Sequence, residues 1–288
     1  MQTCNTVPSH TAVMMGIARA VHPLLDEPVV LGERHACHLL DDALREKLID
    51  DPFQFNDPMM RTMRAAVVAR SCLVRDALRR ETLVAACLSQ SVVVGCGLDG
   101  FSLNESSRYP WMRFFDVDRP SMQAWRKKAL TDSGISQPDN VFAVDCDLNN
   151  QALSQSLESA GYDIRLPALY SMMGVTPYLT RERVYSLLEA IARCPSGSSV
   201  HFDFRVDNGL LDPIEQMMDR VVERQVAAMG EPWRSSFDPD ELEITLKSFG
   251  FKDVTLFDTA ALNRRYFHRR RDGLQTAGGG LRIISARN

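Results

Sequence analysis

Several features that mark other classes of protein are missing from this sequence. It has no Cys-x-x-Cys pair, no internal repeat and no low-complexity tract, and its seven cysteines are odd in number. We therefore expect reduced thiols in a cytosolic protein. No apolar run approaches the ~20 residues of a membrane-spanning helix, and the first residues lack a basic region followed by an apolar core. The sequence predicts a cytoplasmic protein without a membrane segment or signal peptide.

A strong charge of either sign is absent as well. The net charge is −4, which argues against nucleic acid as the main partner. With 288 residues and 45% hydrophobic content, the chain can bury a full core in roughly one or two domains. A basic cluster at residues 264–271 is typical of a solvated surface and can also attract an acidic substrate. His35 and His38 would need further ligands to bind a metal, so we predict no metal site.

The most informative stretch that is present runs Ser91-Val-Val-Val-Gly-Cys-Gly-Leu-Asp-Gly100. A short β-branched run that ends in glycine is typical of a buried parallel strand, and Gly95 and Gly97 let the backbone turn tightly and approach a ligand. Asp116, in Phe114-Phe-Asp-Val-Asp118, would end the next predicted strand. Near the end of a strand, a carboxylate can accept two hydrogen bonds from a ribose diol. The motif predicts a ligand of the adenosine type.

The spacing Gly95-x-Gly97-x-x-Gly100 is also the fingerprint of dinucleotide-binding proteins, so NAD and S-adenosylmethionine both fit it. A dinucleotide needs its pyrophosphate at the start of the following helix, and residues 101–110 are short and polar for such a helix. Ninety residues precede Ser91, whereas a dehydrogenase often places this strand first. Both observations favour the methyl donor, and an NAD-dependent oxidoreductase stays as an alternative.

Short apolar runs alternate with helical stretches after residue 90, which is typical of a parallel sheet with crossover helices. The predicted strands are 91–96, 112–117, 140–145, 167–173, 198–204, 252–257 and 281–286. The predicted helices are 120–131, 150–160 and 180–193, and another begins after an N-capping Asp238 with Pro239 at its first position.

These patterns divide the chain into four segments. Residues 1–90, with helical spacing of apolar residues, form an N-terminal helical cap, and residues 91–204 form the cofactor-binding core. Residues 205–236 interrupt the alternation as an inserted lid element, in which we expect Met217 and Met218 to pack. Residues 237–288 complete the core. The fold class is α/β.

Six segments match the motifs of a known family in the right order, over nearly the whole chain. They are Thr11-Ala12…Arg19-Ala20, Ala69-Arg70-Ser71, Gly95-Cys-Gly97-Leu98-Asp99, Asp116-Val-Asp118-Arg-Pro120, Val141-Phe-Ala-Val-Asp145 and Gly174-Val-Thr-Pro-Tyr-Leu-Thr180. The sequence thereby resembles the class I S-adenosylmethionine-dependent methyltransferases of the leucine carboxyl methyltransferase type, in the branch that O-methylates small molecules such as polyketides. The resemblance implies a Rossmann-like, seven-stranded sheet with helices on both faces, and S-adenosylmethionine as cofactor.

The resemblance also implies roles for individual residues. Arg70 would pair with the methionine carboxylate, because a guanidinium matches a carboxylate better than an ammonium does. Gly95 and Gly97 would pass under the methionine and ribose, and Asp116 would bind the ribose hydroxyls.

Five further residues belong to the predicted cofactor site. Asp145 and Cys146 would flank the adenine, where the carboxylate can accept from the exocyclic amine. Asp99 and Met173 complete the set. Asp118 belongs to it too, although it can equally cap the helix that begins at Pro120.

The sequence departs from the family in two places. After Asp99 it continues Gly-Phe-Ser-Leu-Asn104, so an aromatic residue and an arginine found in many members are missing. This departure motivates a non-catalytic binding or scaffold protein as an alternative function. Where the protein-phosphatase-modifying members have a glutamate, this chain has Met173, so we do not expect a protein C-terminus as substrate.

The expected acceptor follows from the chemistry of methyl transfer. A carboxylate is ionised near neutral pH and needs no general base, which suits a sequence without an obvious base. We therefore expect an acidic small molecule, such as a secondary metabolite, as the acceptor, and leave the oligomeric state open. A carbon or phenol acceptor would need a base, for which Tyr178, His201 and Asp203 are the candidates. His201 and Asp203 would share one face of a strand.

Overall fold

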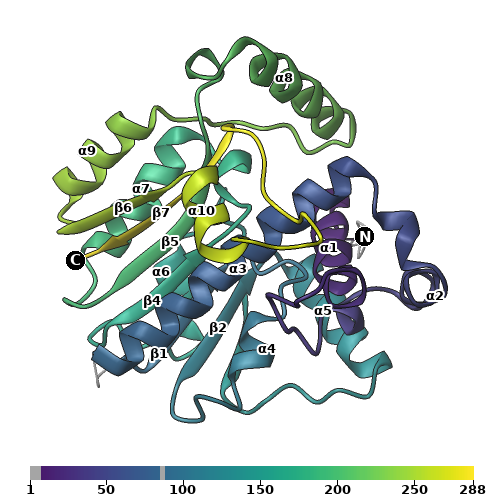
Figure 1. Cartoon of the computed structure of the whole chain (residues 1–288). Helices are drawn as coiled ribbons and strands as arrows, with labels where there is room; N and C mark the ends of the chain where they lie inside the picture. The colour runs from purple at the N-terminus through teal and green to yellow at the C-terminus, as the bar shows by residue number, and fades with distance from the viewer. Residues whose placement is uncertain (1–7, 85–87) are drawn as a thin grey trace.

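The computed structural model describes residues 8–84 and 88–288, and these form an α/β protein built around a seven-stranded sheet (Figure 1). The strand order is β3-β2-β1-β4-β5-β7-β6. Strands β1 to β5 are parallel, and β7 pairs antiparallel with both β5 and β6. The strands are β1 Gln90–Val94, β2 Arg113–Asp118, β3 Val141–Asp145, β4 Ala168–Met172, β5 Ser199–Arg205, β6 Asp253–Phe257 and β7 Leu281–Arg287. The predicted Rossmann-like sheet is confirmed.

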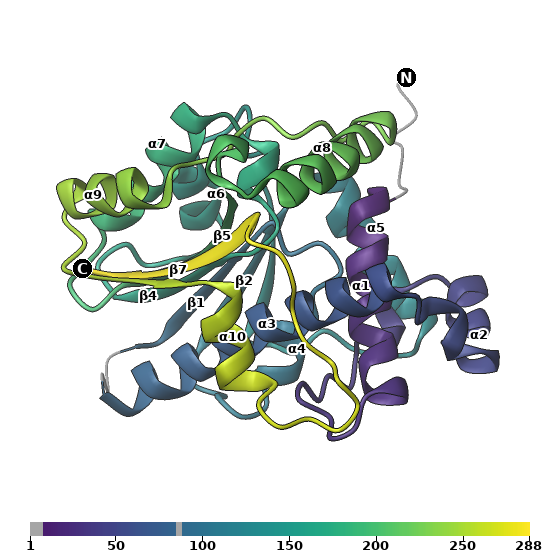
Figure 2. The same cartoon turned by 45° about the horizontal axis from the view of Figure 1, so that its top comes forward.

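Helices cover both faces of this sheet (Figure 2). They are α1 His10–Leu25, α2 Asp42–Asp50, α3 Pro58–Val84, α4 Phe101–Glu105, α5 Pro120–Asp132, α6 Leu153–Ser159, α7 Arg181–Ala192, α8 Pro213–Ala228, α9 Pro239–Phe249 and α10 Thr259–Tyr266. Four 3-10 turns join them: η1 Cys37–Leu39, η2 Pro52–Phe55, η3 Thr176–Tyr178 and η4 Asn208–Leu210. Because both faces are covered, β1 and β4 are buried along their whole length, which explains their continuous apolar runs.

Two hydrophobic layers hold the helices to the sheet. On one face, Phe115 and Phe202 pack with residues of α6, α7 and α9 in a single cluster. On the other, Phe114 packs with Leu78 of α3 and Phe101 of α4. Figure 2 shows α7 and α9 above the sheet and α3, α4 and α10 below it. The predicted strands and helices agree with the observed ones to within a few residues at each end.

The predicted cap at residues 1–90 contains two different kinds of helix. Helix α3 covers the sheet itself, since Val74, Ala77 and Leu78 pack against β1, β2 and β4, whereas α1 lies against α3 beyond it. Residues 1–7 and 85–87 of the cap lie outside the described residues. A Cβ at Gly16 of α1 would lie 3.0 Å from Leu98, just after the glycine turn. Helix α1 therefore reaches the predicted cofactor site.

The inserted segment 205–236 contains α8, whose polar side faces the protein. Asp219 and Glu223 of α8 bind Arg205 at 2.8 and 3.5 Å, and Glu215 accepts from the backbone of Gly279 at 2.8 Å. Met217 and Met218 are 63% and 61% exposed, so the expectation that they pack in the lid was wrong. The carboxylates of α8 have their partners in the body of the protein, which leaves the methionine side outward.

The basic cluster at residues 264–271 begins inside helix α10, which the sequence analysis did not predict. The helix takes in Arg264 and Arg265, and Arg265 binds Asp76 of α3 at 2.7 Å. Further along the cluster, Arg270 binds Asp272. Arg264, Arg269 and Arg271 are exposed, in agreement with a solvated surface.

The cap of α9 gives a first test of the fold. Asp238 accepts from the backbone N–H groups of Asp240 and Glu241, and Pro239 is the first helical residue, both as predicted. We expect Asp238→Ala to lower the free energy of unfolding by about 1 kcal/mol. Urea denaturation would measure this. The control Glu243→Ala, which removes the exposed pair with Lys247, should change it by less than about 0.5 kcal/mol, and equal effects of the two variants would contradict the assigned cap.

Candidate functional site

The turn after β1 depends on two glycines in the left-handed region. Gly95 has φ +69° and Gly97 has φ +47°, which glycine adopts without a steric penalty. A Cβ at Gly95 would lie only 2.4 Å from Cγ2 of Val175, whereas a Cβ at Gly97 would meet nothing closer than 3.9 Å, at Ala12. Gly95 therefore lets the segment after β4 pack against the turn, and Gly97 leaves the backbone open to a ligand.

A buried arginine that sequence reasoning missed holds this turn. Nη1 of Arg126 on α5 donates to the carbonyl oxygens of Gly97 and Asp99, both at 2.8 Å. Its Nη2 binds the Asp116 carboxylate at 2.7 Å, and Ser102 donates to the other Asp116 oxygen at 2.5 Å. Arg126 is 4% exposed. It stands first in the run Arg126-Lys-Lys, where the buried member cannot be told from its solvated neighbours.

Asp116 and Asp118 therefore have different environments. Asp116 is 3% exposed, and both its oxygens have side-chain partners; burial raises its pKa although Arg126 opposes this. Asp118 stands at the end of β2 and accepts from the backbone N–H of Gly97 and of Arg119, both at 2.8 Å. Burial raises its pKa too. The carboxylate that borders the glycine turn is that of Asp118, and α5 begins without a side-chain cap.

Arg70 lies at the same edge of the sheet, on α3. Its Nη1 binds Asp203 of β5 at 3.0 Å, and a Cβ at Gly174 would lie 3.3 Å from Nη1 and 3.5 Å from Nη2. Arg70 is 8% exposed, and its buried Nε has no hydrogen-bond partner within residues 8–84 and 88–288. A buried donor without a partner is costly, so this edge of the guanidinium is suited to an anionic ligand.

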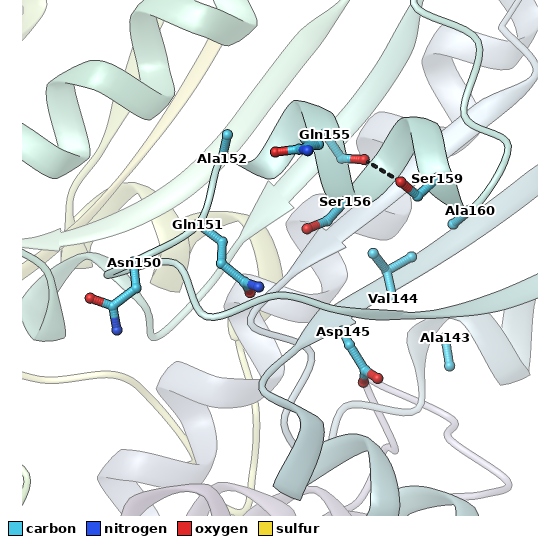
Figure 3. A pocket seen from close by; sticks show the side chains of 10 residues that line it. All are labelled: Ala143, Val144, Asp145, Asn150, Gln151, Ala152, Gln155, Ser156, Ser159 and Ala160. Carbon is cyan, nitrogen blue, oxygen red and sulfur yellow. Dashed lines mark hydrogen bonds between the residues drawn. The ribbon is translucent and has the colours of Figure 1, made fainter.

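Asp145 and Cys146 follow at the end of β3. Asp145 is exposed and lines a cavity of about 610 Å³ beside β3, together with residues that include Gln151 and Ser156 (Figure 3). It also lines a smaller cavity of about 300 Å³ on the α5 side. The backbone N–H of Cys146 donates to the backbone carbonyl oxygen of Asp118 at 2.8 Å, and burial raises the pKa of the Cys146 thiol. The ends of β2 and β3 thus lie together, as an adenosine site requires.

Asp99 and Met173 have structural contacts. Asp99 binds Arg19 of α1 at 2.5 Å and accepts from the backbone of Phe101 at 2.8 Å. It thereby fixes α1 beside the glycine turn. Met173 packs against two of the hydrophobic clusters under α3.

The two predicted catalytic residues lie apart. His201 is 1% exposed in the middle of β5, where Nδ1 lies 2.7 Å from Ser285 and Nε2 lies 3.3 Å from Glu81 of α3. Because protein groups enclose its ring, we assign His201 to the packing of α3 on the sheet. Tyr178 is half-buried in η3, which follows β4 at the carboxyl edge.

The inserted segment also reaches this edge. The backbone N–H of Arg234 donates to Pro177 at 2.6 Å, and Ser235 donates to the carbonyl of Thr176 at 2.8 Å. Glu231 accepts from the first residue of α1, His10, at 2.7 Å. The segment therefore links η3 to the start of α1.

Two further expectations concern metals and membranes. In the part of the chain that the structure describes, no group of three His, Cys, Asp or Glu side chains is arranged to hold a metal ion. Across residues 8–84 and 88–288, no helix combines the length and apolar character needed to cross a membrane.

Comparison with known proteins gives matches over most of the chain. A family model described as leucine carboxyl methyltransferase matches residues 12–192. YktD of Bacillus subtilis (strain 168), named as a candidate S-adenosyl-L-methionine-dependent methyltransferase, is 25% identical over 292 positions, which cover 92% of this chain and 93% of YktD. Rv1896c of Mycobacterium tuberculosis (strain ATCC 25618 / H37Rv), with the same candidate description, is 26% identical over 203 positions, which cover 66% of this chain and 62% of Rv1896c.

Two solved structures share the fold. A protein of the DUF574 family from Streptomyces avermitilis MA-4680 aligns with a TM-score of 0.57 at 17% identity, covering 99% of this chain and 100% of that one. A candidate methyltransferase from Thermobifida fusca YX aligns with a TM-score of 0.53 at 18% identity, covering 99% and 96%. At these identities the similarity establishes the fold alone.

The buried pair of Glu81 and His201 predicts a pH dependence of stability. Burial alone would raise the pKa of Glu81, but hydrogen bonds from His201 and Ser199 hold it below the ordinary 4.5. A carboxylate with a lowered pKa stabilises the folded state above its unfolded pKa, and this contribution is lost as the pH falls through the folded pKa. We expect the free energy of unfolding of the wild type to exceed that of Glu81→Gln most near neutral pH. Below pH 4.5 the difference should shrink.

Chemical denaturation of both proteins at a series of pH values would measure the difference. A difference that stays constant from pH 7 to acid would contradict the assigned pair.

Proposed function

The chain belongs to the leucine carboxyl methyltransferase family, and from this we propose that it transfers a methyl group from S-adenosylmethionine to a carboxyl group of a small, acidic molecule, such as a secondary metabolite. The main observation behind the proposal is that the Nε side of the buried Arg70 guanidinium has no hydrogen-bond partner among the described residues. Arg70 lies at the carboxyl edge of the sheet, near the glycine turn, whose backbone is open at Gly97. The relatives described as S-adenosyl-L-methionine-dependent methyltransferases support the choice of cofactor.

The residues at this edge fit the three parts of the cofactor. Arg70 would bind the methionine carboxylate through Nε and Nη2. Asp118 would bind the ribose hydroxyls, since it borders the glycine turn and each of its oxygens keeps acceptor capacity beyond one backbone N–H. Asp116, the residue first expected in this role, would instead fix the turn through Arg126. The carboxylate of Asp145, which lines the cavity of about 610 Å³ beside β3, would accept from the adenine amine.

When bound, S-adenosylmethionine supplies an electrophilic methyl group on a sulfonium. The task of the protein is then to align the acceptor and to keep water away. Helix α1 and the segment that contains Glu231 meet beside the glycine turn, so we place the acceptor beneath them.

A carboxylate acceptor suits the side chains near this edge. His201 is 1% exposed, and its ring nitrogens face Glu81, Ser199 and Ser285. Asp203 is held by Arg70 and by the backbone of Gly174. An acceptor that is already ionised needs no base, which supports an acid over a carbon or phenol.

Calorimetric titration with S-adenosylmethionine, S-adenosylhomocysteine and NAD tests the cofactor. We expect the first two to bind and NAD not to bind. Asp118→Ala should weaken the affinity for S-adenosylhomocysteine at least about tenfold, because it removes charge-assisted hydrogen bonds. Asp132→Ala, an exposed change on α5, should leave it unchanged. Binding of NAD alone would refute the proposal, and binding of none would favour a scaffold protein.

The acceptor needs a separate assay. With methyl-labelled S-adenosylmethionine, we expect label to pass to small carboxylic acids as base-labile esters and not to the matching primary amides. Tyr178→Phe should keep at least about half of the wild-type rate, because no proton has to leave the acceptor. Methylation of phenols that is lost in Tyr178→Phe would contradict a carboxyl acceptor.

A further inference from the structure

Asp203 is a buried carboxylate near the carboxyl edge of the sheet, and the proposed function gives it no role. It is 1% exposed and stands on β5, two residues before the strand ends. Its Oδ2 binds Nη1 of Arg70 at 3.0 Å, and its Oδ1 accepts from the backbone N–H of Gly174 at 2.6 Å. Its carbonyl oxygen accepts from the Thr176 hydroxyl at 2.7 Å. One residue thus connects α3, β5 and the turn after β4.

The geometry of the ion pair determines which part of Arg70 stays free. A guanidinium can offer a carboxylate the side edge, which is formed by Nε and Nη2, with two parallel N–H groups. Asp203 binds Nη1 and leaves that edge unused. Neither Nε nor Nη2 donates a hydrogen bond to any residue in the described part of the chain, and Nε is fully buried. An arginine held in this way retains a two-donor edge for a second carboxylate.

Gly174 contributes to the same arrangement from the other side. It has φ +72°, and the space where its Cβ would stand is within 3.5 Å of both terminal nitrogens of Arg70. The guanidinium therefore lies against bare backbone. Because Asp203 binds Gly174 and Arg70 with different oxygens, it fixes the spacing between them.

We propose that Asp203 is a positioning residue for the amino-acid end of the cofactor: it holds Arg70 by Nη1 so that Nε and Nη2 face the methionine carboxylate. This inference rests on the proposed function, because it assumes a cofactor with a methionine moiety. Asp203 itself would not contact the cofactor and would act only through Arg70.

Two ligands separate this role from a general effect on folding. S-Adenosylhomocysteine contains the adenosine, the thioether and the amino-acid end, whereas 5′-methylthioadenosine contains the first two and lacks the amino-acid end. In calorimetric titrations, Asp203→Asn should weaken S-adenosylhomocysteine about tenfold or more, because the free Arg70 edge is no longer oriented. Its affinity for 5′-methylthioadenosine should stay within about twofold of the wild type.

A double-mutant cycle tests whether Asp203 acts through Arg70. Arg70→Lys alone should show the same ligand-specific loss, since an ammonium cannot offer the two-donor edge. Adding Asp203→Asn to Arg70→Lys should then cause little further loss. The matched control is Glu81→Gln, which also removes a buried carboxylate that joins α3 to β5, but in the middle of the strand. It should leave the affinity for both ligands unchanged.

The outcomes are distinct. Equal losses for both ligands, additive losses in the double variant or unchanged binding by Asp203→Asn would overturn the positioning role. If the wild type binds neither ligand, the proposed function fails and this inference fails with it. If Asp203→Asn does not fold, Asp203→Glu provides the second variant. It keeps the charge and displaces the guanidinium by one methylene, so the same selective loss of S-adenosylhomocysteine is expected, and equal binding to the wild type would overturn the role.

Discussion

The buried contact between Arg126 and the turn after β1 is the constraint on which the rest of the site depends. This side chain binds two carbonyl oxygens of the turn and the carboxylate of Asp116. A charged group without exposure to water needs such partners, and removing them would leave a charge buried alone. With the turn fixed in this way, Gly95 can touch Val175, and the N–H of Gly97 points to Asp118. The ends of β1, β2 and β4 are thereby held in one arrangement.

Helix α3 places a second set of charges against the sheet. Arg70 and Glu81, on the same long helix, both reach polar side chains of β5. Both contacts are buried polar contacts between α3 and β5, but they lie at different positions along the strand. Glu81 meets Ser199 and His201 well before the end of the strand, while Arg70 meets Asp203 at the edge where parallel strands of this fold bind ligands. We therefore assign the Glu81 contact to packing and the Arg70 contact to the proposed site, because of their positions along the strand.

The fold could be predicted from the sequence because its strands are short, largely apolar runs, of which β1 is followed by Gly95 and β2 and β3 end in aspartate. Sites at strand ends could be located for the same reason, including Gly95, Gly97 and Asp118. Tertiary partners could not be predicted. The alternation in Asp116-Val-Asp118 puts both carboxylates on one face of the strand. Only the position of Arg126 in the structure shows that Asp116 is the one bound to a protein side chain. Likewise, the spacing of Ile214, Met217, Met218 and Val221 indicates an apolar helix face, but it does not indicate that the acidic face of α8 is turned to Arg205.

In the proposed complex, the cofactor lies along the carboxyl edge between Arg70, the glycine turn and Asp118. A crystal structure of the protein with S-adenosylhomocysteine tests it most directly. We expect the amino-acid carboxylate to bind Nε and Nη2 of Arg70 and the ribose hydroxyls to bind Asp118, with Asp116 still bound to Arg126. A complex in which the ligand lies elsewhere, or in which Asp116 leaves Arg126 to bind the ribose, would contradict it.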